Sequence, residues 1–434
     1  MKHEIISDIE SRSMSSFQIT TVTICLILNM LDGFDVLAMA FTAPGIAEDW
    51  NVSPQSLGVL FSAAPIGMML GALFIGPIAD KVGRRMIIMI GLGIITVGML
   101  CSSLTQSVNQ LLIFRILTGL GIGGLLPSLN TMVAEYSSLK RRDFSISFLH
   151  AGYPIGAAIG GSISAFLLLQ FGWQSIFVLG GVMSAIMLLV VFRFLPESLE
   201  FLLAKQPENS LEKTNQVLAK INHPTLTEMP SSKIEEKTQA VGVRYVLSKN
   251  MRATSLLFWS AFFLALFTMF FLLSWIPKIL VDAGYTTSAG ISGSVLFNVG
   301  GVLGGLFLGY ASVWFSLVTR ERFFLFMSVI LMICFVAFSF NYNLLLVCAF
   351  ILGFFVFGSI TGLYAIAPRI YPATVRATGI GWGIGIGRIG AILGPFIAGL
   401  LIGNGFSILF CFIFYALVLL LAFFTMLFLK VPEE

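Results

Sequence analysis

Residues 17–43 read FQITTVTICLILNMLDGFDVLAMAFTA, and the only charged side chains in this apolar run are Asp32 and Asp35. A helix crosses a bilayer in about 20 residues, so the run is long enough to span a membrane. The spacing of the two aspartates places both carboxyl groups on one face of that helix. A charge at this depth costs roughly 2.5–3.5 kcal/mol. We therefore expect the pair to face a wet cavity, meet a cation or carry a proton; a purely structural polar contact is the alternative.

The composition of the whole chain extends this interpretation. Of the 434 residues, 57% are hydrophobic and only 11% are charged, and the mean hydropathy is +0.96. A soluble domain carries about 25% charged residues. We predict an all-α polytopic membrane protein with about twelve transmembrane helices in two six-helix bundles. The predicted spans cover residues 17–43, 56–79, 86–104, 109–134, 145–170, 173–195, 253–280, 289–313, 323–341, 343–367, 374–402 and 405–429.

The polar gap between the two sets of spans divides the chain. We expect an N-terminal bundle at 1–195, a linker loop with one or two surface helices at 196–252, and a C-terminal bundle at 253–434. Lysine and arginine fall in alternate loops and in the linker, so the positive-inside rule places both termini and the linker in the cytoplasm of a cell membrane. The net charge of +4 follows from this topology and does not indicate a nucleic-acid partner.

The most specific motif follows the second span, where residues 76–85 read GPIADKVGRR. Gly83 permits a tight turn, and the basic cluster keeps the loop in the cytoplasm. The segment resembles the loop 2–3 signature of the major facilitator superfamily. That resemblance implies a gating latch formed by Asp80, Gly83, Arg84 and Arg85; a basic loop that only sets topology is the alternative.

Three further features lie at the cytoplasmic edge of the membrane, within the fifth span and at the external edge. Glu135 ends the fourth predicted span ahead of a basic group that includes Arg142, and we interpret these residues as an internal ionic cluster with a conformational role. His150, in the fifth span, is either a proton relay or a helix–helix hydrogen-bonding residue. At the other side, we expect the first helix to end at Pro44 and residues 45–55 to form an acidic external loop.

Arg115 lies in the fourth predicted span and needs an acceptor there. It is roughly 9 Å from the external end of its helix, and Asp35 is roughly 12 Å from the external end of the first helix. We therefore predict that the two side chains pair. The alternatives are that Arg115 extends toward the membrane surface or bonds to backbone carbonyls. The glycine run after it, residues 119–124, indicates close helix packing.

An internal repeat relates the two halves. Residues 142–161 read RDFSISFLHAGYPIGAAIGG, and residues 376–395 read RATGIGWGIGIGRIGAILGP. At the position of Pro154 in the first copy, the second has Arg388, roughly 21 Å along its helix and near the bilayer midplane. A permanent cation there favours an anionic ligand, because a guanidinium binds a carboxylate with two hydrogen bonds. An ion pair with a helix acid is the alternative.

Four stretches together resemble the aromatic acid:proton symporter family of the major facilitator superfamily. They are LDGFDVLAMAFTAP at 31–44, AEYSSLKRR at 134–142, LPESLEFLL at 195–203 and YPATVRATGIGWGIGIGRIGAILGP at 371–395. The resemblance implies import of benzoate-like or hydroxybenzoate-like anions with protons by alternating access. One departure is the loop 8–9 copy of the basic motif, which is degenerate at 309–322 (GYASVWFSLVTRER).

The resemblance also suggests roles for single residues. Asp32 would carry the proton, because a carboxylate that loses its water is easier to protonate, and Asp35 would be the member paired with Arg115. Arg388 and Asp35 would contribute to substrate binding. Aromatic surface around the ligand would come from Phe34, Tyr153, Tyr364 and Trp382, for each of which ordinary helix packing is the alternative.

The same residues also bear on other classes of function. Transport or export of another organic anion, such as a dicarboxylate or an unsaturated diacid, would use the same fold. A membrane sensor is disfavoured because the linker is too small for an output domain. An enzyme is disfavoured because the three histidines are far apart and no nucleophile–base arrangement is present. We expect no cofactor or metal, and a monomer whose partners are a small organic anion, protons and the lipid bilayer.

Overall fold

The computed structural model describes residues 11–230, 246–249, 251–310, 316–338, 341–372 and 375–429. Within these ranges the regular structure is helical. The six long helices of the first half are α2 (Ser16–Trp50), α3 (Pro54–Phe74), α5 (Arg84–Ser103), α6 (Val108–Glu135), α7 (Arg142–Phe171) and α8 (Gln174–Phe194). Those of the second half are α12 (Arg252–Asp282), α13 (Thr287–Tyr310), α14 (Leu317–Ala337), α15 (Tyr342–Ile370), α16 (Arg376–Gly403) and α17 (Ile408–Phe428).

Each of these twelve helices overlaps a predicted span; the largest differences are that α2 ends at Trp50 and that α14 begins at Leu317. In the described part of the chain, 11 helices are long and apolar enough to cross a membrane, and α14 is the long helix that is not among them. The reason is its polar start, where Arg320, Glu321 and Arg322 follow one another. The count of long helices therefore agrees with the prediction, whereas composition by itself supports eleven.

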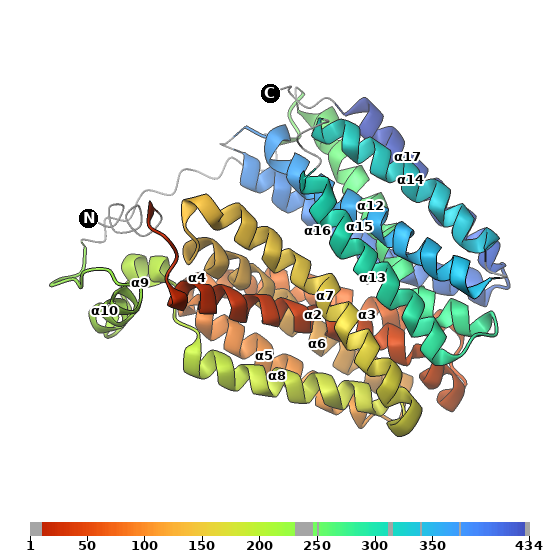
Figure 1. Ribbon diagram of the computed structural model, residues 1–434, viewed down its shortest axis with the longest axis horizontal. Helices are drawn as coiled ribbons and strands as arrows, with labels where there is room; N and C mark the ends of the chain where they lie inside the picture. Colours follow the sequence, from red (N-terminus) through yellow and green to blue (C-terminus); the bar gives the residue numbers. More distant parts are fainter. Residues whose placement is uncertain are drawn as a thin grey trace.

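The two halves form two bundles that lie side by side (Figure 1). The linker contributes the short helices α9 (Leu199–Lys205) and α10 (Ser210–Lys220), which lie beside the first bundle. We call the end of the molecule that carries α9 and α10 the linker end, and the opposite end the far end. The bundles meet where α3 packs on α16, α7 on α13 and α2 on α12.

The first helix does not end at Pro44, as the sequence suggested. Helix α2 continues through Pro44 to Trp50, so most of the expected acidic loop is helical and only residues 51–53 connect it to α3. A proline inside a helix removes one backbone hydrogen bond. Tertiary contacts compensate here, because Trp50 packs edge-to-face on Trp173 at 5.2 Å between ring centroids and the Trp173 Nε1 donates to Asp49 at 2.7 Å.

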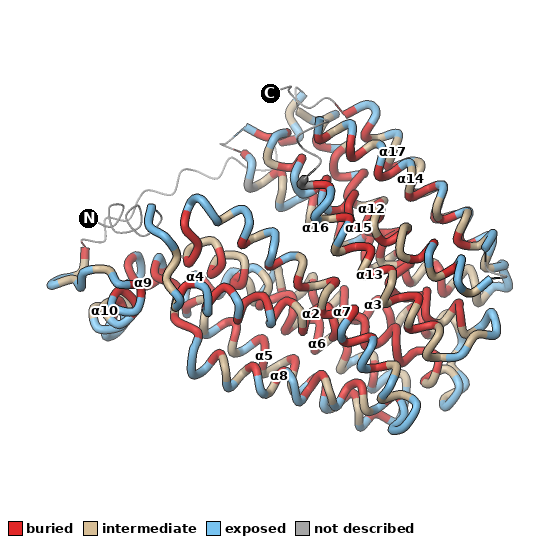
Figure 2. The backbone as a smooth tube through the Cα atoms, in the orientation of Figure 1, coloured by how far each residue is buried: buried red, intermediate tan, exposed pale blue. Residues whose placement is uncertain are grey.

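The glycines predicted to serve helix packing do so. Gly119 and Gly123 of α6 lie directly against the backbone of Ala64 and Met68 of α3, where a side chain would have no room. Small residues allow this close approach between membrane helices. The outer faces carry exposed apolar side chains, among them Leu73, Phe166, Leu189 and Phe428. Figure 2 shows the exposed positions along the outside of both bundles and the buried ones where helices face each other.

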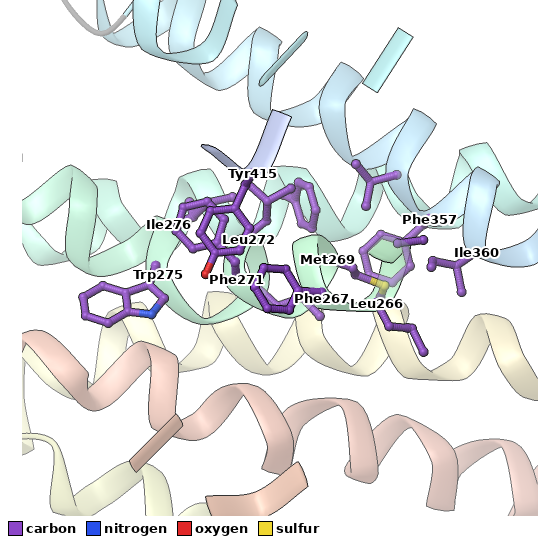
Figure 3. Close-up of a cluster of buried hydrophobic side chains, with 14 of the residues drawn as sticks. Leu266, Phe267, Met269, Phe271, Leu272, Trp275, Ile276, Phe357, Ile360 and Tyr415 are labelled. Atoms are coloured by element: carbon purple, nitrogen blue, oxygen red, sulfur yellow. The ribbon is translucent and has the colours of Figure 1, made fainter. Parts of the chain in front are cut away.

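Stacked aromatic rings hold the second bundle together. Tyr415 of α17 stacks on Phe271 of α12 with 3.9 Å between ring centroids, and on Phe267 at 5.1 Å (Figure 3). The Tyr415 hydroxyl donates to the Gly394 carbonyl of α16. Ring pairs of this kind contribute about 0.5–1.5 kcal/mol each beyond the area they bury. They fix α12 against α16 and α17, and so position the face of α16 that carries Arg388.

Candidate functional site

The two acids of α2 point into different surroundings. Asp32 is 3% exposed and Asp35 is fully buried. Asp32 precedes Val36 by one helical turn, and Val36 lines a small cavity between α2, α3 and α12 with residues of both bundles. Asp35 instead lies inside the first bundle, where its Oδ1 is close to Gly180 of α8. Asp32 instead interacts electrostatically with Tyr153 of α7, the helix of the first bundle that packs on α13 of the second.

Arg115 meets Asp35, but not as an ion pair between side chains. Its Nη2 donates to the Asp35 backbone carbonyl at 2.5 Å, its Nη1 approaches the Met99 sulfur at 3.0 Å, and its guanidinium lies over the Phe177 ring at 5.6 Å. Neither carboxylate oxygen of Asp35 has a hydrogen-bond partner. Arg115 thus lies next to Asp35 as expected and interacts with it electrostatically, but its hydrogen bond goes to the Asp35 backbone carbonyl.

Tyr153 lies beside Asp32 where α7 packs closely on α2. Gly33 rests on the Tyr153 backbone, and Asn29 Nδ2 donates to the Leu149 carbonyl at 2.6 Å. The Tyr153 hydroxyl is buried without a hydrogen-bond partner, as is Oδ2 of Asp32. Tyr153 also interacts electrostatically with Asp32, so two unsatisfied polar groups lie near each other where α2 packs on α7.

Arg388 lies on the face of α16 that points to the first bundle. Ile392, one turn further along, accepts a hydrogen bond from the Ser62 hydroxyl of α3 at 2.7 Å, and Gly399 packs on Gly58. Positions 388, 392, 395 and 399 follow the spacing of a single helix face. Arg388 is therefore one turn toward the linker end from the point where the two bundles touch. It is half-buried, and it interacts electrostatically with the Tyr364 hydroxyl.

Aromatic side chains surround this position in the second bundle. Tyr364 of α15 packs edge-to-face on Phe262 at 4.9 Å between centroids, and it stacks across the bundle boundary on His150 of α7 at 6.4 Å. Trp382 of α16 stacks on Trp259 at 6.0 Å. Tyr364 and Trp382 remain 45% and 48% exposed. Both side chains therefore keep about half of their surface exposed.

Phe34 does not share these surroundings. It is 4% exposed and packs inside the first bundle against Gly160 of α7 and Gly180 of α8. Its ring fills the space that these two glycines leave, so ordinary helix packing accounts for it. This placement does not favour a contact between Phe34 and a ligand held between the bundles.

Sequence reasoning missed two partners of the aromatic group and one acid. Trp259 and Phe262 of α12 support Trp382 and Tyr364, but in the sequence they are two among many aromatic residues of apolar helices. Glu321 of α14 is fully buried. The predicted span began at residue 323, so Glu321 was assigned to a loop. The sequence feature that could have indicated this acid is the charged triplet at 320–322, which the structure places within the helix.

The loop 2–3 motif contacts the start of the linker. The Glu197 carboxylate accepts a hydrogen bond from the Arg85 backbone amide at 3.0 Å and packs on Gly83, whose φ of 104° suits glycine. Arg85 also donates to the Phe192 carbonyl. Asp80 forms an ion pair with Arg84 at 2.9 Å. These contacts all lie within the first bundle and its linker.

Glu135, at the end of α6, also forms hydrogen bonds with the start of the linker. Its carboxylate accepts the Ser198 hydroxyl at 2.7 Å and the Glu200 backbone amide at 3.3 Å, and the Arg142 Nε donates to the Ala134 carbonyl at 3.1 Å. The neighbouring Tyr136 hydroxyl donates to the Glu197 carbonyl at 2.7 Å. Burial raises the pKa of Tyr136 well above its usual value, so this donor keeps its proton at neutral pH. Glu135 therefore joins the end of α6 to the linker by hydrogen bonds, and it also interacts electrostatically with Arg84.

The family follows from the sequence match. A model of the Major Facilitator Superfamily matches residues 24–341. The chain belongs to this superfamily. It is accordingly a multi-pass membrane transporter and not an enzyme. The solved structure of the xylose transporter XylE from E. coli, in a partially occluded inward open conformation, shares the fold with a TM-score of 0.74 at 16% identity. The match covers 97% of this chain and 99% of that one.

Proteins whose names give their substrate support the resemblance to one family within the superfamily. The 4-hydroxybenzoate transporter PcaK of Acinetobacter baylyi is 34% identical, over 92% of this chain and 88% of its own. The gallate transporter of Pseudomonas putida is 31% identical, over 93% and 90% of the two chains. The benzoate transport protein of A. baylyi is 28% identical, over 91% and 85%. The resemblance to the aromatic acid:proton symporter family is thereby confirmed.

Proposed function

We propose that this protein imports an aromatic carboxylate of the benzoate or hydroxybenzoate type together with protons. The observation that supports this best is the position of Arg388, a cation on the face between the bundles, one turn from their contact. Its guanidinium would hold the carboxylate with two hydrogen bonds. Tyr364 and Trp382, each of which is partly exposed, would pack on the substrate ring. The named substrates of the relatives are aromatic acids, which agrees with this chemistry.

Proton coupling is assigned to Asp32. Its Oδ2 is buried without a hydrogen-bond partner, and it lies near Tyr153 of α7, a helix that packs on α13 of the second bundle. An unpaired carboxylate is costly in such surroundings, so Asp32 is suited to take up a proton when the site closes. Asp35 and Arg115 would support α2 from inside the first bundle. Tyr153, beside Asp32, would adjoin the substrate from the same side.

In alternating access, the two ends of the interface between the bundles would open and close in turn. In this structure the bundles touch toward the far end, through Ser62 and Ile392 and through Phe61 and Trp275, whose ring centroids are 5.1 Å apart. The loop 2–3 motif and Glu135 hold the linker to the first bundle and would act as its latch. The basic residues at the linker end favour a cell-membrane protein with both termini in the cytoplasm, and we propose that it acts as a monomer.

Uptake by proteoliposomes tests this function. Labelled 4-hydroxybenzoate and benzoate are offered under an inward proton gradient, which an uncoupler then collapses. We expect accumulation that disappears on collapse. Asp32→Asn should reduce accumulation by at least about tenfold while substrate exchange without a gradient persists, because only proton binding is removed. The control Asp143→Asn alters an exposed acid of α7 and should change neither activity.

Two results would contradict the proposal. Full gradient-driven accumulation by Asp32→Asn would show that another group carries the proton. Failure of the folded wild-type protein to take up either acid would refute the aromatic substrate class, and uptake of a dicarboxylate in its place would identify a different organic anion.

A further inference from the structure

Glu321 is a buried acid that the transport mechanism above does not use. It lies near the start of α14, is 0% exposed, and neither of its carboxylate oxygens has a hydrogen-bond partner. Its carboxyl group rests against Gly362 of α15, and Leu308 of α13 adjoins the same point. A side chain at position 362 would occupy the place of the Glu321 carboxylate. The absent side chain of Gly362 thus creates the space in which the acid lies.

The neighbouring cations are engaged elsewhere. Arg320 Nη1 donates to the Leu308 carbonyl. Arg322 donates from Nε to the Met426 carbonyl at 3.0 Å and from Nη2 to the Leu427 carbonyl at 3.3 Å, which closes the end of α17. Both guanidinium groups therefore bond to backbone carbonyls of neighbouring helices. Neither forms an ion pair with Glu321.

The helices packed around Glu321 bring few other ionisable groups to this end. Helix α13 has no charged side chain in its described residues, and α17 has no ionisable side chain in its last two described turns. Helix α15 contributes Tyr364 and Arg369, and Arg369 acts electrostatically on Arg320. Among the described residues, no cation lies within ion-pair distance of the Glu321 carboxylate.

A carboxylate in this position would be a buried charge without a counter-charge or a hydrogen bond. Such burial costs far more than burial of the neutral acid, and a group in this situation is neutralised by a proton. We propose that Glu321 is a proton-binding site in the C-terminal bundle, separate from the acid pair of α2. It lies about 6 Å from the start of its helix, so a proton has a short route to the water at the linker end.

Helix α15 connects this proton to the ligand site. Gly362, against Glu321, and Tyr364, which interacts with Arg388, are two residues apart on that helix and point to different sides of it. An ionised Glu321 would seek water and loosen α14 from α15, and so shift Tyr364. This connection to the ligand rests on the proposed function; the proton site itself does not.

Infrared spectroscopy of the full-length protein in lipid nanodiscs tests the proton site directly. A protonated carboxyl group has a C=O stretching band that an ionised one lacks. The double variant Asp32→Asn/Asp35→Asn removes the acids of α2, and we expect a band of protonated acid to remain at neutral pH. Adding Glu321→Gln should remove that band. Adding Glu208→Gln, which alters an exposed acid of the linker, should leave it in place.

Thermal unfolding supplies a second readout that needs no substrate. A group that is neutral when folded and ionised when unfolded releases a proton on unfolding, so stability falls as the pH rises. Glu321→Gln should therefore lower the dependence of the unfolding temperature on pH, and Glu208→Gln should not. Glu321→Met is a second uncharged variant, for use if Glu321→Gln does not fold.

The outcomes are decisive in both directions. Loss of the band with Glu321→Gln or Glu321→Met supports the proposal, even if the protein transports no aromatic acid. Identical spectra with and without Glu321 would overturn it, because the carboxyl group would then be ionised. If neither uncharged variant folds, the absence of a protonated-acid band from Asp32→Asn/Asp35→Asn would overturn it, because Glu321 would then be ionised.

Discussion

Arg388 illustrates how one substitution between repeats can create a site. Helices α7 and α16 begin at equivalent residues, Arg142 and Arg376, and share their register, yet Pro154 in the first corresponds to Arg388 in the second. Proline offers no donor, whereas the guanidinium offers five. The same position in the two bundles therefore has opposite chemical character, and only the second can hold an anion.

Replacing Arg388 tests its role as anchor. Hydrogen bonds to charged groups contribute about 1.5–3 kcal/mol, so Arg388→Ala should weaken 4-hydroxybenzoate binding by roughly 10- to 150-fold. Arg388→Lys should recover part of the loss, because it keeps the charge but not the paired donors. Calorimetric titration of the purified protein measures both. Arg193→Ala, at an exposed arginine of α8, serves as the control, and an affinity of Arg388→Ala equal to that of the control would exclude the anchor role.

At the scale of elements, the contact between α3 and α16 determines whether the far end is closed. A side chain at Gly58 would lie 3.0 Å from the Gly399 Cα and 3.0 Å from the Pro395 carbonyl oxygen. The two helices can approach this closely because both contact positions are glycine. The approach also brings Ser62 within reach of Ile392. Closure of this end therefore depends on the absence of two side chains.

Gly58→Val should keep the far end open. The added methyl groups would separate α3 from α16, so a cysteine introduced at Gln55, which packs on Gly403, should react faster with a membrane-impermeant maleimide. Gly93→Val is the matched control, because nothing lies within 4 Å of the place a side chain would take there. Equal labelling rates in the two variants would show that this glycine contact does not close the far end.

At the scale of the molecule, the two bundles are separate units joined along one interface. Transport by alternating access requires them to move relative to each other. His150 and Tyr364 face each other across the boundary with 6.4 Å between ring centroids, one residue from each bundle. A covalent link at this point would therefore resist any relative motion of the bundles, whereas a link within one helix would not.

Cross-linking across the boundary should stop transport. With cysteines at positions 150 and 364, a short reducible bifunctional reagent should abolish substrate accumulation, and reduction should restore it. A control link between cysteines at Lys278 and Asp282, an ion-paired couple within α12, should leave transport intact. Accumulation at the wild-type rate by fully cross-linked protein would contradict a rocking motion at this boundary. The readout is uptake into proteoliposomes before and after reduction.

The sequence by itself determined the membrane class, the helices and the family. Apolar runs long enough to span a bilayer leave few alternatives, since every backbone polar group must be satisfied within the span. The repeat relating residues 142–161 to 376–395 predicted two equivalent helices, which in the structure begin at Arg142 and Arg376. The charged and aromatic residues of the candidate site were also visible, because such side chains are conspicuous in apolar helices.

Only the tertiary structure decided what those side chains meet. Helical spacing placed Asp32 and Asp35 on one face, but Asp35 packs inside the first bundle by Gly180 of α8, whereas Asp32 interacts electrostatically with Tyr153 of α7. Depth in the membrane predicted that Arg115 lies near Asp35, but only the packed helices show that it bonds the backbone carbonyl. Pro44 signalled a helix end that the contact of Trp50 with Trp173 overrides.

Glu321 shows most clearly that the sequence does not determine which groups a side chain contacts. The sequence presents it between two arginines, which suggests a paired surface acid. In the folded chain both arginines reach backbone carbonyls of other helices, and the acid is enclosed against Gly362. Local sequence fixes periodicity and composition, which determine the helices. Partners come from residues far apart in the chain, and their identity depends on how the helices pack.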